Sequence, residues 1–127
     1  QNIIYRSLWE RKFMNYCDLN ENILEWASEE FWIPYLDPTT NRVRRYFPDF
    51  FIKYKDKDSN IRRSVIEVKP MRETLEPKAT KGKSRKTMIN ESMTYVKNQA
   101  KWKAAREFCA DRKLEFKIMT EKELGIR

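Results

Sequence analysis

Apolar residues recur along this chain at two spacings, one typical of helices and one typical of strands. The first helix is predicted from Ser7 to about Leu19, because Ser7 and Glu10 have the spacing of a capping box. Its buried face is predicted to consist of Trp9, Phe13, Tyr16 and Cys17. A second, long helix is predicted over 87–111. Its core stripe is predicted to consist of Ile89, Met93, Val96, Ala100, Ala104 and Phe108.

Short runs rich in aromatic and β-branched residues, separated by polar turns, predict strands. Before the long helix they are 23–27, 29–36, 42–55 and 61–69, and after it 114–119. Pro48 requires an edge, a bulge or a strand start within the third run. The order α-β-β-β-β-α-β, with a long helix between the last two strands, predicts a βαβ crossover. The expected fold is α/β (α+β), with a mixed sheet flanked by helices. Residues 120–123 predict the start of one more helix.

The length of 127 residues suits one domain, 1–127, and the 40% hydrophobic content predicts a packed core that includes Trp26, Trp32 and Trp102. Because the chain begins at Gln1, a short upstream segment is expected to be missing from it. No apolar run approaches the length of a membrane span, so no membrane partner is expected. Cys17 and Cys109 fit neither a zinc spacing nor a disulfide framework, which predicts reduced thiols.

A net charge of +8 with a pI near 9.5 predicts a polyanionic partner, the alternative being a basic domain without a nucleic-acid role. The chain has no histidine and two glycines, Gly82 and Gly125. These counts exclude histidine-ligated metals, Ser-His and Cys-His hydrolases and glycine-rich phosphate loops. Carboxylates, lysines and a metal remain for phosphate chemistry.

Residues 46–69 contain the strongest candidate site. Two apolar strands each carry a carboxylate, Asp49 near the start of one and Glu67 near the end of the next, and Lys69 lies on the same strand face as Glu67. Buried charges are costly unless paired or metal-bound. The pair predicts a Mg²⁺ site, with Mn²⁺ as a substitute and the Val68 carbonyl as a further ligand. The alternative is that Asp49 only ends a turn and Glu67 pairs with Arg63 or Lys69.

Four further groups of residues are candidates for this chemistry. Lys69 is suited to orienting or deprotonating the attacking water, or is a plain surface lysine. Glu10 is either a helix cap or a carboxylate that completes the metal site, and Gln99 either contacts the cluster or DNA or is solvated. Two basic sets are predicted to contact DNA phosphates, with solvated loops as the alternative. They are Lys78, Lys81, Lys83, Arg85 and Lys86, and Arg42, Arg44 and Arg45.

Pro48-Asp49 followed by Glu67-Val68-Lys69 resembles the motif of the PD-(D/E)xK nucleases. The segments Ser7–Glu10, Ile33–Tyr35 and Arg45–Phe50 resemble the TnsA-like branch, and nearly the whole chain resembles the head completion nucleases of tailed phages. The resemblance implies a restriction-endonuclease-like core and metal-dependent cleavage of double-stranded DNA. It also implies metal binding by Asp49 and Glu67, catalysis by Lys69, an auxiliary role for Glu10 and, as a weaker transfer, one for Gln99.

The same resemblance implies action in the host cytoplasm during head maturation, with head and neck proteins as partners and association with the virion. Little of the chain remains to read bases, which favours weak sequence specificity. A homodimer is compatible with this function, because two copies would provide two sites for two strands. The alternatives are a non-catalytic DNA-binding head or neck protein, and a transposase-type or junction-resolving endonuclease.

Overall fold

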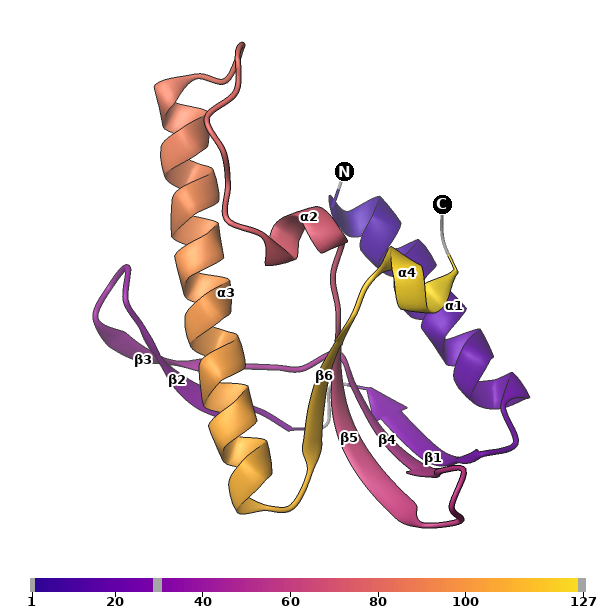
Figure 1. The fold of residues 1–127 in the computed structure, drawn as a ribbon. Coiled ribbons are helices and arrows are strands. Elements are labelled where there is room, and N and C mark those ends of the chain that lie inside the picture. The colour runs from indigo at the N-terminus through magenta and orange to yellow at the C-terminus, as the bar shows by residue number, and fades with distance from the viewer. Residues whose placement is uncertain (1, 29–30, 126–127) are drawn as a thin grey trace.

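The computed structural model describes residues 2–28 and 31–125, with side chains described from Leu8 onward. The helices are α1 (Asn2–Leu19), α2 (Met71–Thr74), α3 (Arg85–Asp111) and α4 (Glu121–Leu124). The strands are β1 (Ile23–Ser28), β2 (Ile33–Asp37), β3 (Arg42–Tyr46), β4 (Phe50–Lys55), β5 (Ile61–Val68) and β6 (Glu115–Met119). The predicted α+β fold, with a mixed sheet flanked by helices, is confirmed (Figure 1).

The main sheet has the strand order β1-β4-β5-β6. Its first three strands are antiparallel neighbours, whereas β5 and β6 are parallel. Parallel neighbours require a crossover connection, and α3 supplies it, as the sequence predicts. The other two strands, β2 and β3, form a separate antiparallel ribbon that extends away from the sheet behind α3 in Figure 1.

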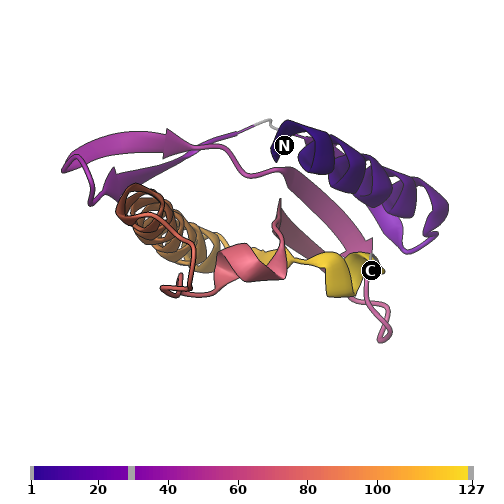
Figure 2. The ribbon, with the colours of Figure 1, turned by 90° about the horizontal axis from the view of Figure 1, so that it is seen from above.

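Side-chain alternation along β5 divides the core between two faces of the sheet. Ile66 and Val68 pack with Phe13 of α1. Residues 65 and 67 therefore point to the other face. There α3 and the β2–β3 ribbon pack together through Trp102, Tyr35 and Tyr46. Viewed from above, α1 and α3 lie on opposite sides of the main sheet (Figure 2), so Glu67 faces α3.

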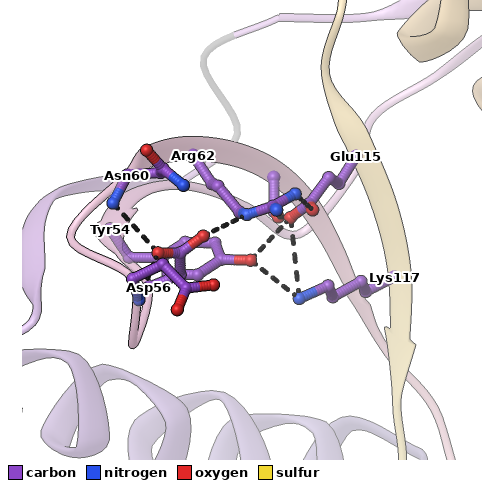
Figure 3. A network of polar contacts seen from close by, with 8 residues as sticks. Tyr54, Asp56, Asn60, Arg62, Glu115 and Lys117 are labelled. Carbon is purple, nitrogen blue, oxygen red and sulfur yellow. Dashed lines mark hydrogen bonds and ion pairs between the residues drawn. The ribbon is translucent and has the colours of Figure 1, made fainter.

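A polar network joins β4, β5 and β6 at the end of the sheet away from residues 49 and 67 (Figure 3). At its centre, Glu115 accepts hydrogen bonds from Tyr54 at 2.7 Å and Ser64 at 2.6 Å. Arg62 bridges Glu115 at 3.1 Å and Asp56 at 2.6 Å. These contacts fix the mutual register of the three strands whose opposite ends carry the candidate site.

The single strand predicted over 42–55 is wrong, because the chain forms two strands there in two different sheets. β3 belongs to the ribbon and β4 to the main sheet, with Phe47, Pro48 and Asp49 between them. Pro48 cannot donate a ladder hydrogen bond, so the break falls where a proline was expected to impose one. Five strands rather than four thus precede α3. Of the strand predicted over 29–36, positions 29–30 lie outside the described residues.

The capping box predicted at Ser7 and Glu10 is also wrong. α1 begins at Asn2, so Ser7 lies within the helix rather than at its N-terminal cap. By contrast, the helix start predicted near 120–123 is confirmed as α4, where Thr120 and Glu123 form a true capping box. None of the described helices combines the length and apolar character needed to cross a membrane.

Only part of the core stripe predicted on α3 is packed. Ala100, Ala104 and Phe108 lie against the core, whereas Ile89, Met93 and Val96 are 53%, 45% and 42% exposed. The reason is visible in Figure 1, where the N-terminal half of α3 extends past the end of the main sheet. Of the tryptophans expected in the core, Trp102 is buried, and Trp26 is partly buried against the core cluster that contains Phe13 and Phe50. Trp32 is 44% exposed, so that expectation is wrong for Trp32.

Candidate active site

Asp49 lies between buried Pro48 and the first residue of β4 and is 6% exposed. Its Oδ2 accepts a hydrogen bond of 2.8 Å from the backbone N–H of Val68. β4 pairs with β5 only from Phe50, opposite Ile66, so Val68 lies past the start of β4. The Asp49 carboxylate therefore occupies the position where a ladder carbonyl would otherwise accept this hydrogen bond.

Glu67 precedes Val68 on β5 and is 5% exposed. Its Oε1 is buried without a well-aligned hydrogen-bond partner among the described residues, and its Oε2 lies 4.0 Å from Nζ of Lys69. Burial raises the pKa of the Glu67 carboxyl, the negative charge of Asp49 raises it further, and Lys69 offsets this only in part. The site therefore has two buried carboxylates but one neighbouring lysine, so its negative charge is only partly balanced.

Lys69 follows β5 and is half-buried. Its backbone N–H donates a 2.9 Å hydrogen bond to the Met119 carbonyl, which continues the pairing with β6 to this point. The 4.0 Å contact with Glu67 confirms that the two side chains share one strand face. The structure therefore brings Asp49, Glu67, Val68 and Lys69 together, as the sequence pattern indicates.

Tyr46, the last residue of β3, is a neighbour of this pair that the sequence analysis missed. It is 3% exposed, and its buried hydroxyl lies beside the Glu67 carboxyl, although the two do not form a well-aligned hydrogen bond among the described residues. Burial and then the nearby charge of Glu67 raise the pKa of Tyr46. The only signal in the sequence is the position of Tyr46 three residues before Asp49, which does not reveal that the Tyr46 side chain lies beside Glu67.

The donor set fits a divalent cation that prefers oxygen ligands. Two carboxylates converge, and one Glu67 oxygen is unpaired. Within a strand the N–H and C=O of one residue point to the same side. The Val68 carbonyl therefore faces the side on which its N–H meets Asp49. Among the residues that the structure describes, no group of three or more His, Cys, Asp or Glu side chains could hold a metal, so the acidic site is a pair.

Glu10 and Gln99 lie on α1 and α3, which cover opposite sides of the main sheet. Glu10 is half-buried on α1, one turn before Phe13, whose ring centroid lies 4.6 Å from that of Phe50. Gln99 is half-buried on α3, and its neighbour Asn98, which the sequence analysis overlooked, is 4% exposed. The roles of Glu10 and Gln99 stay predictions.

The excess positive charge of the chain is confined to one region. Residues 77–106 contain nine Lys and Arg but one acid, Glu91, whereas the rest of the chain contains 18 of each sign. We call residues 77–106, which form the loop before α3 and most of that helix, the basic arm. It includes all five residues of the first predicted DNA-binding set, which are exposed, although Lys83 also bridges Glu91 at 2.9 Å.

The second predicted DNA-binding set lies on β3, where two of its members have partners within the chain. Nε of Arg44 lies 3.0 Å from the fully buried carboxylate of Asp37. The guanidinium of Arg45 lies 4.7 Å from the centre of the Trp32 ring. Arg42 is exposed at the end of the ribbon. The basic arm is therefore the stronger candidate surface for DNA.

Comparison with known proteins gives two matches. Residues 20–121 match the family described as TnsA-like endonuclease N terminal, a range that includes Asp49, Glu67 and Lys69 but not Glu10. The chain is also 38% identical over 122 residues to the head completion nuclease of Enterobacteria phage T4, which covers 94% of this chain and 79% of the relative. No solved structure matches.

Proposed function

Since this chain belongs to the family of TnsA-like endonucleases, we propose that it hydrolyses phosphodiester bonds of double-stranded DNA at the Asp49–Glu67 pair with Mg²⁺. The observation that carries this proposal is the burial of both carboxylates beside Lys69, with one Glu67 oxygen unpaired. A buried pair of this kind is costly for a structural role alone. Binding of a cation would remove that cost.

Asp49 and Glu67 would hold the cation, with the Val68 carbonyl as a third ligand from the protein. A bound divalent ion supplies positive charge to the scissile phosphate and lowers the pKa of a coordinated water. The Val68 N–H fixes one Asp49 oxygen, so this carboxylate is oriented before any ligand arrives. Mn²⁺ is expected to substitute, because its ligand preferences overlap those of Mg²⁺.

Lys69 would supply a positive charge beside the two carboxylates. Its ammonium lies 4.0 Å from Glu67, within reach of a water or phosphate oxygen placed beside the pair. There it would orient the attacking water or stabilise the charge that develops on the phosphate. Glu10 and Gln99 would have auxiliary roles at the edges of the site.

DNA would be held mainly through its phosphates by the basic arm. Each neutralised phosphate adds affinity that falls with salt but carries no sequence information. This distribution of charge supports cleavage with little sequence preference.

The relative named head completion nuclease supports a role in completing phage heads, in the host cytoplasm and beside head and neck proteins. Two alternatives make different predictions. A DNA-binding head protein without catalysis would bind DNA with or without Mg²⁺ and never cut it. A transposase-type or junction-resolving enzyme would cut only branched DNA or act only with a partner protein.

The test is cleavage of supercoiled, nicked and branched DNA with Mg²⁺, Mn²⁺ or EDTA. Wild type and Glu25→Gln, a control in an exposed glutamate of β1, are expected to cut in either metal. Glu67→Gln is expected to bind DNA but to lose at least about 10²-fold in rate, as for loss of a metal ligand or its support. Equal cleavage by wild type and Glu67→Gln would refute the proposed site.

A further inference from the structure

The β2–β3 ribbon has an apolar face that no described part of the chain covers. We define the outer face of the ribbon by the alternate residues Trp32, Pro34, Leu36, Val43, Arg45 and Phe47. Register pairs Pro34 with Arg45 and Leu36 with Val43, so these side chains are neighbours. Trp32, Leu36, Val43 and Phe47 are 44%, 56%, 73% and 51% exposed. Four large apolar side chains in one patch mark an interaction surface.

The opposite face of the ribbon is firmly packed, so the outer face is held in place. Ile33 and Tyr35 are 1% and 6% exposed and pack against Trp102 of α3. Asp37 is fully buried and pairs with Arg44 at 3.0 Å. The outer face is therefore a preformed surface rather than a loose hairpin.

The chemistry of the outer face suits protein rather than DNA. Interfaces with DNA are strongly positive, whereas the centres of protein interfaces are poor in charge and rich in aromatic residues and arginine. The outer face has one charged residue, Arg45, which stacks on Trp32 at 4.7 Å. The charge available for DNA lies in the basic arm instead.

We propose that the outer face of the ribbon binds the same face of a second copy of this chain. With about half of each exposed, the four large side chains offer roughly 100 Å² apiece. With Pro34 and Arg45 each copy would bury about 600 Å², so a dimer would bury about 1,200 Å², at the lower end of specific interfaces. One arginine per copy causes little repulsion, in contrast to two basic arms brought together.

A dimer of this kind would serve the proposed endonuclease, on which this part of the inference rests. Phe47 lies two residues before Asp49, so in each copy the interface begins within about 7 Å of chain from Asp49. Two copies would present two Asp49–Glu67 pairs to one duplex. The area predicts a weak dimer, with a Kd of about 1–100 µM, that DNA binding would favour by concentrating the protein.

The test is sedimentation equilibrium of wild type, Leu36→Glu and Leu19→Glu across this concentration range, with melting temperatures to confirm folding. Leu19 lies at the end of α1 and is 84% exposed, so Leu19→Glu is a control that makes the same substitution on another surface. Wild type and Leu19→Glu are expected to dimerise, and Leu36→Glu to raise the dissociation constant at least 10-fold. A wild type that stays monomeric, or a dimer unaffected by Leu36→Glu, would overturn the inference.

Plasmid cleavage separates this inference from the proposed function. If both hold, Leu36→Glu nicks supercoiled DNA at the wild-type rate per chain but makes at least 10-fold less linear product. Linear product that does not fall in Leu36→Glu contradicts the link between the interface and double-strand cutting. Absence of all cleavage by a wild type that dimerises would refute the proposed nuclease function while leaving the interface in place.

Discussion

The backbone N–H of Val68 donates a 2.8 Å hydrogen bond to Oδ2 of Asp49, and this contact joins the two strands of the candidate site. It takes the place of a ladder bond just beyond the start of β4. Glu67 precedes Val68 on β5, so the hydrogen bond that extends the sheet also holds the Asp49 carboxylate beside that of Glu67.

Glu67→Gln is expected to make the metal-free protein more stable at neutral pH. The pKa of Glu67 is raised by burial and by Asp49, so charging this carboxyl weakens the folded state. The cost is absent below the unfolded value near 4.5, grows as pH rises from there to the higher folded pKa, and stays constant above it. Thermal melts in EDTA should show a gain of at least about 1 kcal/mol near pH 8, or about 3–5 °C, and little gain at pH 4.5.

The same substitution should remove the stabilisation that metal gives. Wild type is expected to melt at higher temperature as Mg²⁺ or Mn²⁺ is added, because a ligand that binds only the folded state stabilises it. The melting temperature of Glu67→Gln should not change when either metal is added. A lower melting temperature for Glu67→Gln than for wild type, both in EDTA at pH 8, would contradict the assignment of Glu67 as a buried charge that destabilises the folded state.

Asp49→Asn and Asp49→Ala are expected to differ in stability but not in activity. An asparagine oxygen can still accept the Val68 N–H, whereas alanine leaves a buried donor unsatisfied at a cost of about 1–3 kcal/mol. Both should lose at least about 10²-fold in cleavage rate, because neither supplies a charged ligand. Urea unfolding and plasmid nicking measure the two effects, and an active Asp49→Asn would argue against metal binding at this residue.

The basic arm is expected to account for the salt dependence of DNA binding. Replacing Lys81, Arg85 and Lys86 by alanine should lower the slope of log affinity against log salt by about 2–3, since each phosphate contact contributes about 0.9. A matched control replaces Lys53, Lys55 and Lys57, three basic residues at the other end of β4 and in its turn. Fluorescence anisotropy with duplex DNA measures both slopes, and equal losses in the two triple mutants would contradict a localised DNA surface.

The network around Glu115 is expected to make stability depend on pH in the acid range. Partial burial acts to raise the pKa of Glu115, but hydrogen bonds from Ser64 and Tyr54 and the charge of Lys117 outweigh it and lower the pKa to about 2. This stabilisation is complete above the unfolded value near 4.5 and is lost as pH falls toward 2.

Glu115→Gln should therefore cost about 1–2 kcal/mol at pH 7 and progressively less toward pH 2. Urea unfolding at a series of pH values measures this, with Glu25→Gln on an exposed face of β1 as the control. A deficit in Glu115→Gln that did not shrink with acid would count against the network in Figure 3.

Local patterns were enough to predict the centre of the site. Asp49, Glu67 and Lys69 lie on or directly beside two strands joined by a short turn, and alternation alone assigns Glu67 and Lys69 to one face. The family resemblance then supplied the chemistry. The long-range features were not predictable in this way, because nothing near Tyr46 in the sequence indicates that β3 forms a separate ribbon with β2 or that Tyr46 lies beside Glu67.

The stripe on α3 illustrates the same limit. Ile89, Met93 and Val96 continue the helical spacing of the buried residues, but periodicity does not reveal where the sheet beneath a helix ends. The exposure of the outer face of the ribbon could not be predicted for a similar reason. Alternation predicts two faces for a strand but not which of them finds a partner within the chain.

The most direct measurement of the central claim is anomalous diffraction from crystals of the protein soaked in Mn²⁺. The account predicts one strong peak within about 2.0–2.3 Å of carboxylate oxygens from both Asp49 and Glu67, and loss of that peak in Glu67→Gln. Mn²⁺ bound elsewhere, or no peak at this pair under saturating Mn²⁺, would contradict it.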